Sequence, residues 1–194
     1  YSSLICERDK IEEADALFIE STYGDRRHKP LNQSVEEFKE AVVSTLKVNG
    51  TILIPSFALE RTQEILWLLH EMHDNGELPK CRIFLDSPLA IKATKLYNKY
   101  PGHLSDELEY SSVNGKDPFS FAWLETTTTR DQSMTINRVK ERSIIIAGSG
   151  MCNGGRIMHH LKHRLWNPRN SVIFVGYQAE GTLGINIVDG QHSV

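Results

Sequence analysis

Ser143-Ile144-Ile145-Ile146-Ala147-Gly148-Ser149-Gly150-Met151-Cys152-Asn153-Gly154-Gly155-Arg156 is the stretch that decides the fold. It opens with a short, continuous apolar run, which is typical of a strand buried on both faces of a parallel sheet. A glycine-rich loop follows at once. Apolar residues at helical spacing (Ile157, Leu161 and Leu165) come after the loop. A strand, a tight loop and a helix in this order indicate an α/β unit.

Further apolar runs of the same character, each ending in polar residues, occupy residues 15–20, 51–55, 82–86 and 171–176. Helical periods separate most of them, starting at a capping box (34–37), at Arg61 and at the Ser87-Pro88 pair. We therefore predict an α/β fold with three layers, in which helices cover both faces of a mostly parallel sheet. The threonine-rich stretch 103–130 interrupts the rhythm, and alternating aromatic residues within it predict a short edge strand.

Composition excludes several classes of protein. The chain has 194 residues, a formal net charge of −3, 40% hydrophobic and 24% charged residues, which is typical of a globular domain and not of disorder or a coiled coil. No apolar run reaches the roughly 18 residues that a membrane span needs, so we expect no membrane contact. Three scattered cysteines suit a reducing compartment, and we expect a cytoplasmic protein. The Tyr1-Ser2 start resembles neither a signal peptide nor a methionine start, so we expect a piece of a longer protein.

Polar residues follow the expected strands, at the edge where open parallel sheets bind ligands. They include Glu20, Ser56, Asp86 with Ser87, and the glycine loop after residue 147. Each hydroxyl taken alone is better explained as a helix cap. Their gathering at one edge nevertheless predicts a binding site.

The glycine loop itself suits an anion. Backbone amides freed by glycine at a helix start can bind phosphate, and Arg156 stands beside them. It is not a Walker A loop, because no Gly-Lys-Ser/Thr closes it. A dinucleotide fingerprint would need an acidic residue after the next strand, where Val175-Gly176-Tyr177 provides none. A tight turn without a ligand remains the alternative.

Two basic clusters flank this arrangement, at residues 26–29 and 159–169. Each is compatible with a nucleic-acid backbone or with a plain solvated surface. His159 and His163, at i and i+4, could face one metal ion, but the sequence offers no third ligand nearby. We treat Cys152 as a small packing residue.

Five segments together resemble the β-CASP family of metallo-β-lactamase-fold ribonucleases, which includes the pre-mRNA 3′-end processing endonuclease. They occur in the family order and cover nearly the whole chain: Glu20–His28, Ile54–Glu64, Leu85–Ala90, Ser149–Arg156 and Gly176–Gly184.

The resemblance implies a two-domain enzyme that hydrolyses RNA at two zinc ions held by a metallo-β-lactamase core, with the β-CASP domain as the lid of the cleft. It implies that Glu20 orients a histidine beside the zinc ions and that the Ser149–Gly150 loop holds an RNA phosphate. Together with the sequence reading above, it gives the following RNA-binding candidates: Ser149, Gly150, Met151, Gly155, Arg156, Arg61, Ser56, Ser87, Tyr23 and His28.

The sequence departs from the family pattern at the histidine motifs, and this affects what we expect for metal binding and activity. The chain contains no His-x-His, so the zinc-binding His-x-His-x-Asp-His motif is absent, and His192 does not match the later β-CASP histidines. We therefore expect no zinc in this chain, and we expect it to be inactive alone. Residues 1–28 and 177–194 are predicted to be flanks of the metallo-β-lactamase core, and residues 29–176 to be the β-CASP domain. Its expected partners are RNA and that core, and the full-length enzyme is compatible with a homodimer.

Two alternatives stay open at this point. The chain could be a stand-alone α/β module that binds RNA or nucleotides, or part of a pseudo-enzyme whose metal site is degraded.

Overall fold

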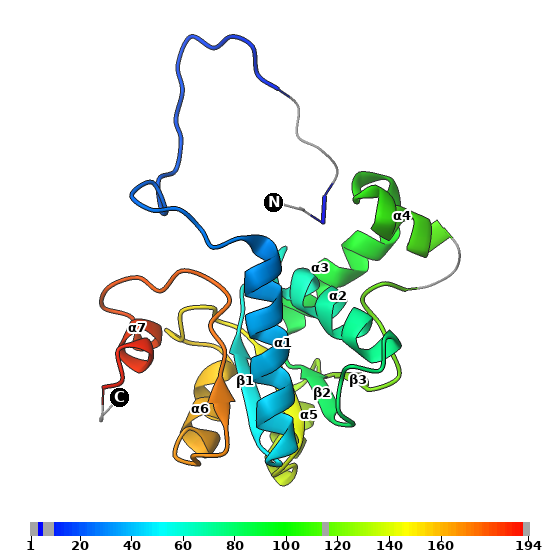
Figure 1. The fold of residues 1–194 in the computed structure, drawn as a ribbon, viewed down its shortest axis with the longest axis vertical. Coiled ribbons are helices and arrows are strands. Elements are labelled where there is room, and N and C mark those ends of the chain that lie inside the picture. The colour runs from blue at the N-terminus through cyan, green and yellow to red at the C-terminus, as the bar shows by residue number, and fades with distance from the viewer. Residues whose placement is uncertain (1–3, 6–9, 114–116, 192–194) are drawn as a thin grey trace.

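The computed structural model describes residues 4–5, 10–113 and 117–191. Figure 1 shows a twisted sheet with helices packed around it, and an extended segment before the first helix. In chain order the elements are α1 (Leu31–Lys47), β1 (Thr51–Pro55), α2 (Arg61–Asp74), β2 (Arg82–Leu85), α3 (Pro88–Lys99), η1 (Pro101–His103), α4 (Asp106–Val113), β3 (Leu124–Thr126), α5 (Arg130–Thr135), η2 (Ile136–Arg138), β4 (Ser143–Ala147), α6 (Ile157–Arg164), β5 (Ser171–Val172) and α7 (Leu183–Val188).

The sheet has five parallel strands in the order β3-β2-β4-β1-β5. Its central strand, β4, pairs along its whole length with β1, from Thr51 opposite Ser143 to Pro55 opposite Ala147. The same strand pairs with β2 on its other side. This arrangement confirms the predicted α/β fold with a parallel sheet.

Alternate residues of the central strands enter two separate cores, because successive side chains of a strand point to opposite faces. Ile52 and Ile54 of β1 pack with apolar residues of α1, α2, α3 and α4. Leu53, between them, packs on the other face with Ile157 and Leu161 of α6. The continuous apolar runs are therefore explained by burial on both faces, which makes the protein three-layered.

Several local predictions are confirmed. The predicted strands at 51–55 and 143–147 match β1 and β4, and β2 ends one residue before its predicted limit. The helix α3 starts after Ser87, whose side chain accepts a hydrogen bond from the Ala90 amide at 3.3 Å. An edge strand does lie within 103–130, as β3, but it follows the alternating aromatic residues and begins at Leu124. Its ladder begins where the Ile83 amide donates to the Trp123 carbonyl.

The predicted capping box at residues 34–37 is wrong. The helix α1 begins at Leu31 with Pro30 at its N-cap position. The Ser34 amide already donates to the Pro30 carbonyl at 3.1 Å, so Ser34 lies within the helix and cannot cap it. Its apolar face is nevertheless the predicted one, because Phe38, Val42 and Leu46 are buried.

The predicted strand at residues 15–20 is also wrong. The described residues of this segment form no strand, and Phe18 is 97% exposed. The run has the composition of a buried strand but no strand of the sheet beside it to supply hydrogen bonds and burial.

The edge strand β5 is shorter than predicted and ends at Val172. One more ladder hydrogen bond follows it, from the Ile173 amide to the Leu53 carbonyl.

No helix within the described ranges has both the length and the apolar character to cross a bilayer.

Candidate functional site

The ends of three neighbouring strands meet around Gly148, which directly follows β4. A Cβ atom placed on Gly148 would lie 3.7 Å from the Ser56 carbonyl oxygen and 3.8 Å from the Ser87 hydroxyl. Ser56 follows β1 and Ser87 follows β2 closely, so the structure brings three of the predicted polar positions together at the carboxyl edge of the sheet. Both distances are ordinary van der Waals contacts, so the three strand ends pack closely around this residue.

The loop that follows Gly148 is closed by its own backbone. The Ser149 amide donates to the Gly154 carbonyl at 3.2 Å, and the Ile157 amide donates to the Gly148 carbonyl at 3.0 Å. The Ser149 hydroxyl oxygen also accepts from the Asn153 amide at 3.1 Å. The loop is therefore a preformed turn into α6, closed by hydrogen bonds between its first and last residues.

Gly155 makes this closure possible. Its φ of +74° lies in the left-handed region, and a Cβ atom there would come within 2.3 Å of the Gly148 carbonyl oxygen. A Cβ atom placed on Gly154, the residue directly before it, would have no neighbouring atom within 4 Å. The two neighbouring glycines thus face very different steric demands.

Arg156 does not point freely into solvent at the loop. Its Nη1 donates to Asp86 Oδ1 at 2.7 Å and to the Thr127 carbonyl at 2.9 Å, and its Nη2 donates to the Thr128 carbonyl at 2.9 Å. The guanidinium therefore joins α6 to the end of β2 and to the loop after β3. Its predicted contact with an RNA phosphate stays a prediction.

Asp86 is the centre of this arrangement and is completely buried. Besides Arg156, its carboxylate accepts hydrogen bonds from Ser133 Oγ at 2.6 Å, from His160 Nε2 at 2.6 Å and from the Thr127 hydroxyl. Burial alone would raise the pKa of Asp86, but the hydrogen bonds from His160, Ser133, Thr127 and Arg156 outweigh it and hold the pKa well below its ordinary value. Asp86 is therefore a buried carboxylate anion.

His160 donates to Asp86 as a neutral imidazole. Burial lowers its pKa by more than the hydrogen bond and the charge of Asp86 raise it. The partners assign the tautomer, because Nε2 faces the Asp86 carboxylate and Nδ1 lies 3.4 Å from an Arg164 nitrogen, which can only donate. Arg164 is itself buried and donates to the Ile136 carbonyl at 2.8 Å.

The sequence interpretation missed this network. It placed Asp86 at the sheet edge but gave it no role, and it grouped His160 with an exposed basic surface. One signal was available: His160 lies three residues after Ile157 and one before Leu161, on the apolar side of the helix. A polar residue on an apolar helix face requires a buried partner.

A second set of contacts ties the loop to the segment after β5. The Gln178 side-chain amide donates to the Gly150 carbonyl at 3.0 Å, and the Gly184 amide donates to the Met151 carbonyl at 3.1 Å. Gly150 also lies under the Phe57 ring, where a Cβ atom would come within 2.7 Å of the ring carbons. Gly150 and Met151 are therefore fixed between the ends of β1 and α7.

Ser56 and Arg61, which flank the loop between β1 and α2, are held by side-chain contacts of their own. Ser56 is buried and accepts from the Thr62 hydroxyl at 3.0 Å. Arg61 donates to Glu64 at 2.5 Å, and burial raises the pKa of Glu64 by more than the Arg61 charge lowers it. The two side chains thus form a pair at the start of α2.

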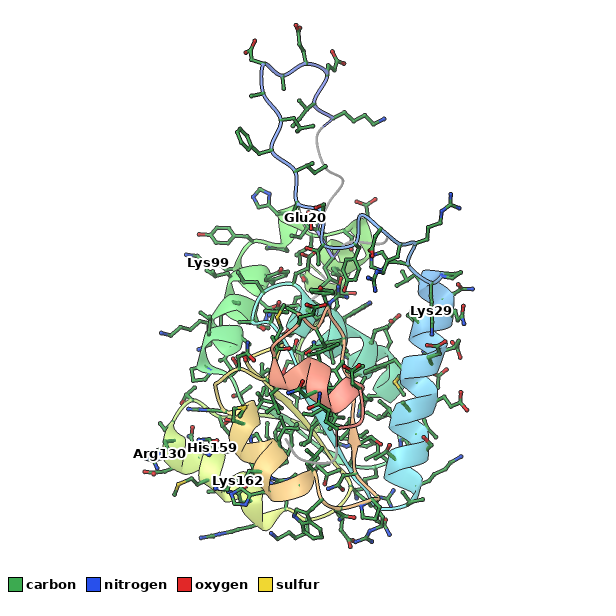
Figure 2. The ribbon with its side chains drawn as sticks, turned by 90° about the vertical axis from the view of Figure 1, so that its left-hand side faces the viewer. Glu20, Lys29, Lys99, Arg130, His159 and Lys162 are labelled. Atoms are coloured by element: carbon green, nitrogen blue, oxygen red, sulfur yellow. The ribbon has the colours of Figure 1, made fainter. Side chains whose placement is uncertain are left out.

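Glu20, Tyr23 and His28 come from the extended N-terminal segment. Figure 2 shows Glu20 at the base of the exposed loop, at the end of the molecule where α1 begins. Its carboxylate accepts from the Thr22 amide at 2.8 Å, and the hydrogen bonds of Thr22 lower its pKa. The Tyr23 ring lies edge-on to His28, at 4.3 Å between centroids, and to Tyr177, at 5.6 Å. The first and last parts of the described chain therefore meet through Tyr23.

No group of three or more His, Cys, Asp or Glu side chains in the described part of the chain is arranged to hold a metal ion. The pair considered from the sequence, His159 and His163, lies on the exposed side of α6. The remaining histidine of that helix, His160, is occupied by Asp86. His192 lies outside the described residues.

Comparison with known proteins adds a family assignment to this geometry. Residues 62–187 match the model of the Beta-Casp domain. The chain is 45% identical over 175 residues to a protein named ribonuclease TTHA0252 from Thermus thermophilus, covering 90% of this chain and 40% of that protein. It is 36% identical over 186 residues to an RNase J-like protein from Methanocaldococcus jannaschii, covering 95% and 42%.

A third relative carries a different name. The chain is 37% identical over 184 residues to a transcription termination factor FttA from Lokiarchaeum, covering 93% of this chain and 29% of that protein. The chain thus spans less than half the length of each of these relatives.

Proposed function

The chain belongs to the Beta-Casp domain family, and from this membership we propose that it is the RNA-binding lid of a longer, zinc-dependent ribonuclease. The names of two relatives, a ribonuclease and an RNase J-like protein, support a nuclease that acts on RNA. The lid role is supported by the position of the glycine loop, which is fixed at the carboxyl ends of the strands together with Ser87 and Arg61.

The observation that carries this proposal is the fixed glycine loop beside Ser56 and Ser87. An anion-binding loop works best when its amides are already oriented, because no ordering cost is then paid on binding. The loop is held by its own backbone at Gly154 and by Gln178 at Gly150. We infer that RNA phosphates lie along this edge, between the loop and Arg61.

Zinc does not fit the described residues of this chain, which provide no suitable group of ligands. In the proposed enzyme the metal ions are held by the remainder of the polypeptide, and the residues described above bind and orient RNA. We propose residues 1–28 and 177–194 as flanks that connect this domain to that remainder, with Gln178 and Gly184 also holding the glycine loop. Residues 1–3, 6–9 and 192–194 lie outside the described residues. The exposed apolar run around Phe18 supports this division, because it lacks a sheet of its own.

RNA binding by this chain is the direct test. We expect fluorescence anisotropy to show salt-sensitive binding of a labelled single-stranded RNA, since phosphate contacts release counterions. Arg61→Ala should weaken binding and lower the salt slope by about one unit. Arg82→Ala is the matched control, because Arg82 is also paired with a glutamate, Glu125, but starts β2 at the opposite edge of the sheet. Equal effects of the two variants would place RNA elsewhere.

Cleavage is tested by comparing this chain with the longer protein that contains it. We expect the chain to bind RNA without cleaving it, and the longer protein to cleave RNA and to lose activity on zinc removal. Metal-dependent turnover by this chain alone would contradict the lid proposal. Binding without cleavage by the longer protein would instead support a pseudo-enzyme.

A further inference from the structure

A hollow of about 290 Å³ lies beside the amino-terminal ends of the parallel strands. The candidate site lies at the opposite, carboxyl-terminal ends. The lining of the hollow includes Trp166, Lys140, His163 and Arg169. The position follows from two contacts at the start of β1: the Asn170 side chain accepts from the Thr51 amide at 2.8 Å, and Gly50 lies against the Arg169 carbonyl. Since β1 is five residues long, roughly 15 Å of sheet separates this hollow from the glycine loop.

Trp166 is the unusual feature of this surface. It is 77% exposed, although tryptophan is among the side chains with most to gain from burial. Its indole Nε1 donates to the His163 carbonyl at 3.0 Å, which limits the orientations of the ring. The structure therefore presents an aromatic surface to solvent in a restricted position.

Positive charge surrounds this ring. Residues 138–142 and 162–169 together contain six arginines and lysines but a single acid, Glu141, in a chain whose net charge is −3. Arg169 lies 3.7 Å from Glu141, and both are half-exposed, so solvent screens the pair. Figure 2 shows Lys162, His159 and Arg130 in the lower part of the molecule, away from Glu20 at the top.

We propose that this hollow binds one nucleotide of a single RNA strand, with the base stacked on Trp166 and the adjacent phosphates beside Lys140 and Arg169. An exposed aromatic ring among cations is the combination that single-strand-binding surfaces use. A duplex would hide its base faces from the indole. The volume of about 290 Å³ lies just below the range for ligand pockets, roughly 300–1,000 Å³, and so suits a single nucleotide rather than a larger ligand.

The choice of RNA over DNA rests on the proposed function, whereas stacking on Trp166 does not. The hollow extends the RNA contact to the far side of the domain from the glycine loop. It would hold a substrate strand at a second point.

Tryptophan fluorescence tests the proposal locally. We expect an unlabelled oligouridylate of about 12 nucleotides to quench the emission of this chain saturably, and we expect Trp166→Phe to abolish that quench. Trp67 and Trp123 remain in the variant and report on any binding elsewhere. An unchanged quench in Trp166→Phe would overturn the assignment.

Affinity provides the second measurement. Trp166→Ala should weaken RNA binding at least about fivefold, while Trp166→Phe keeps a stacking surface and should stay within about twofold. Lys140→Ala should reduce the salt slope by about one unit, and Lys95→Ala, an exposed lysine of α3, should leave it unchanged. Wild-type affinity in Trp166→Ala would reject the proposal.

Two competitor arms complete the experiment. A polyglutamate peptide that produced the same Trp166-dependent quench at equal affinity would identify an acidic polypeptide as the occupant and overturn the RNA assignment. Oligodeoxyuridylate binding more tightly than RNA would overturn the choice of RNA but not the stacking site. Failure of the proposed function is distinguishable, because it would appear as an unchanged affinity in Arg61→Ala while the Trp166 quench persists.

Discussion

Asp86 and Arg156 are seventy positions apart in the chain, and their side chains meet with 2.7 Å between Oδ1 and Nη1. This ion pair joins the strand β2 to the helix α6 across the carboxyl edge of the sheet. The carboxylate is completely buried and the guanidinium is mostly buried. The pair therefore holds the glycine loop against the rest of the domain.

Replacing the Asp86 charge is expected to destabilise the domain. Asp86→Asn would leave the Arg156 guanidinium without its anion. It would also replace one of the two carboxylate oxygens by an NH2 group, which removes the acceptor of two of the four donors, so the change should cost about 3 kcal/mol. Urea unfolding measures this loss. Glu125→Gln, which breaks the exposed pair with Arg82, is the control and should cost less than about 1 kcal/mol. Similar costs for both variants would show that burial of Asp86 does not matter.

Acidification is expected to weaken the fold in two steps. The pKa of His160 is lowered in the folded state, so the unfolded chain takes up a proton more readily once the pH falls below about 6.5. The pKa of Asp86 is also lowered, which adds a second loss below about pH 4. Stability should therefore fall as the pH is lowered. Thermal unfolding between pH 7 and pH 5 should show a flatter slope in His160→Gln, and an identical slope would reject His160 as the cause.

The two neighbouring glycines of the loop should respond differently to alanine. Gly155→Ala introduces a Cβ atom at positive φ and against the Gly148 carbonyl, and should cost about 1–3 kcal/mol. Gly154→Ala meets open space and should be neutral or slightly stabilising. Chemical unfolding compares the pair, and RNA affinity should fall only in Gly155→Ala. Equal behaviour would mean that the loop rearranges freely.

The buried thiols should be inert in the folded protein. Burial raises the pKa of Cys81 to about 12 and that of Cys152 to about 11, so both are neutral thiols at pH 8. Because the thiolate is the nucleophile, iodoacetamide should label both slowly in the native chain and rapidly in urea. Peptide mass spectrometry separates them from Cys6, which lies outside the described residues. Rapid native labelling of Cys152 would show that the loop opens.

Substitution at Phe18 should leave the stability of this chain unchanged. Since its side chain is almost fully exposed, Phe18→Ser should shift the free energy of unfolding by less than about 0.5 kcal/mol. Phe38→Ala, in the core of α1, should cost about 3–5 kcal/mol. A large cost at Phe18 would show that residues 15–20 pack on this domain after all.

The central sheet was predictable because its signal is local. The runs at 51–55 and 143–147 are apolar throughout, and parallel strands buried on both faces require that pattern. Residues 15–20 carry the same pattern, and their exposure shows its limit. Apolar composition reports that a segment needs burial, but it does not say which surface provides it.

The candidate site was predictable only in outline. The glycine loop and the hydroxyls of Ser56 and Ser87 follow from the rule that strand ends share an edge. The partners of Asp86 do not, because His160 and Ser133 reach it through tertiary packing over long sequence distances. The same packing brings Arg156 to Asp86, a contact that the sequence did not indicate.

The strand order also governs when the sheet can form. The strands β1 and β2, which are synthesised early, lie on either side of β4 and pair with it rather than with each other. A chain that has grown only to residue 142 therefore holds β1 without either of its partner strands, whereas β2 can pair only with β3. The centre of the sheet closes when residues 143–147 enter between them, a long-range step of the kind that slows folding. During synthesis, the strands made earlier can complete the sheet only after residues 143–147, directly before the glycine loop, have been added.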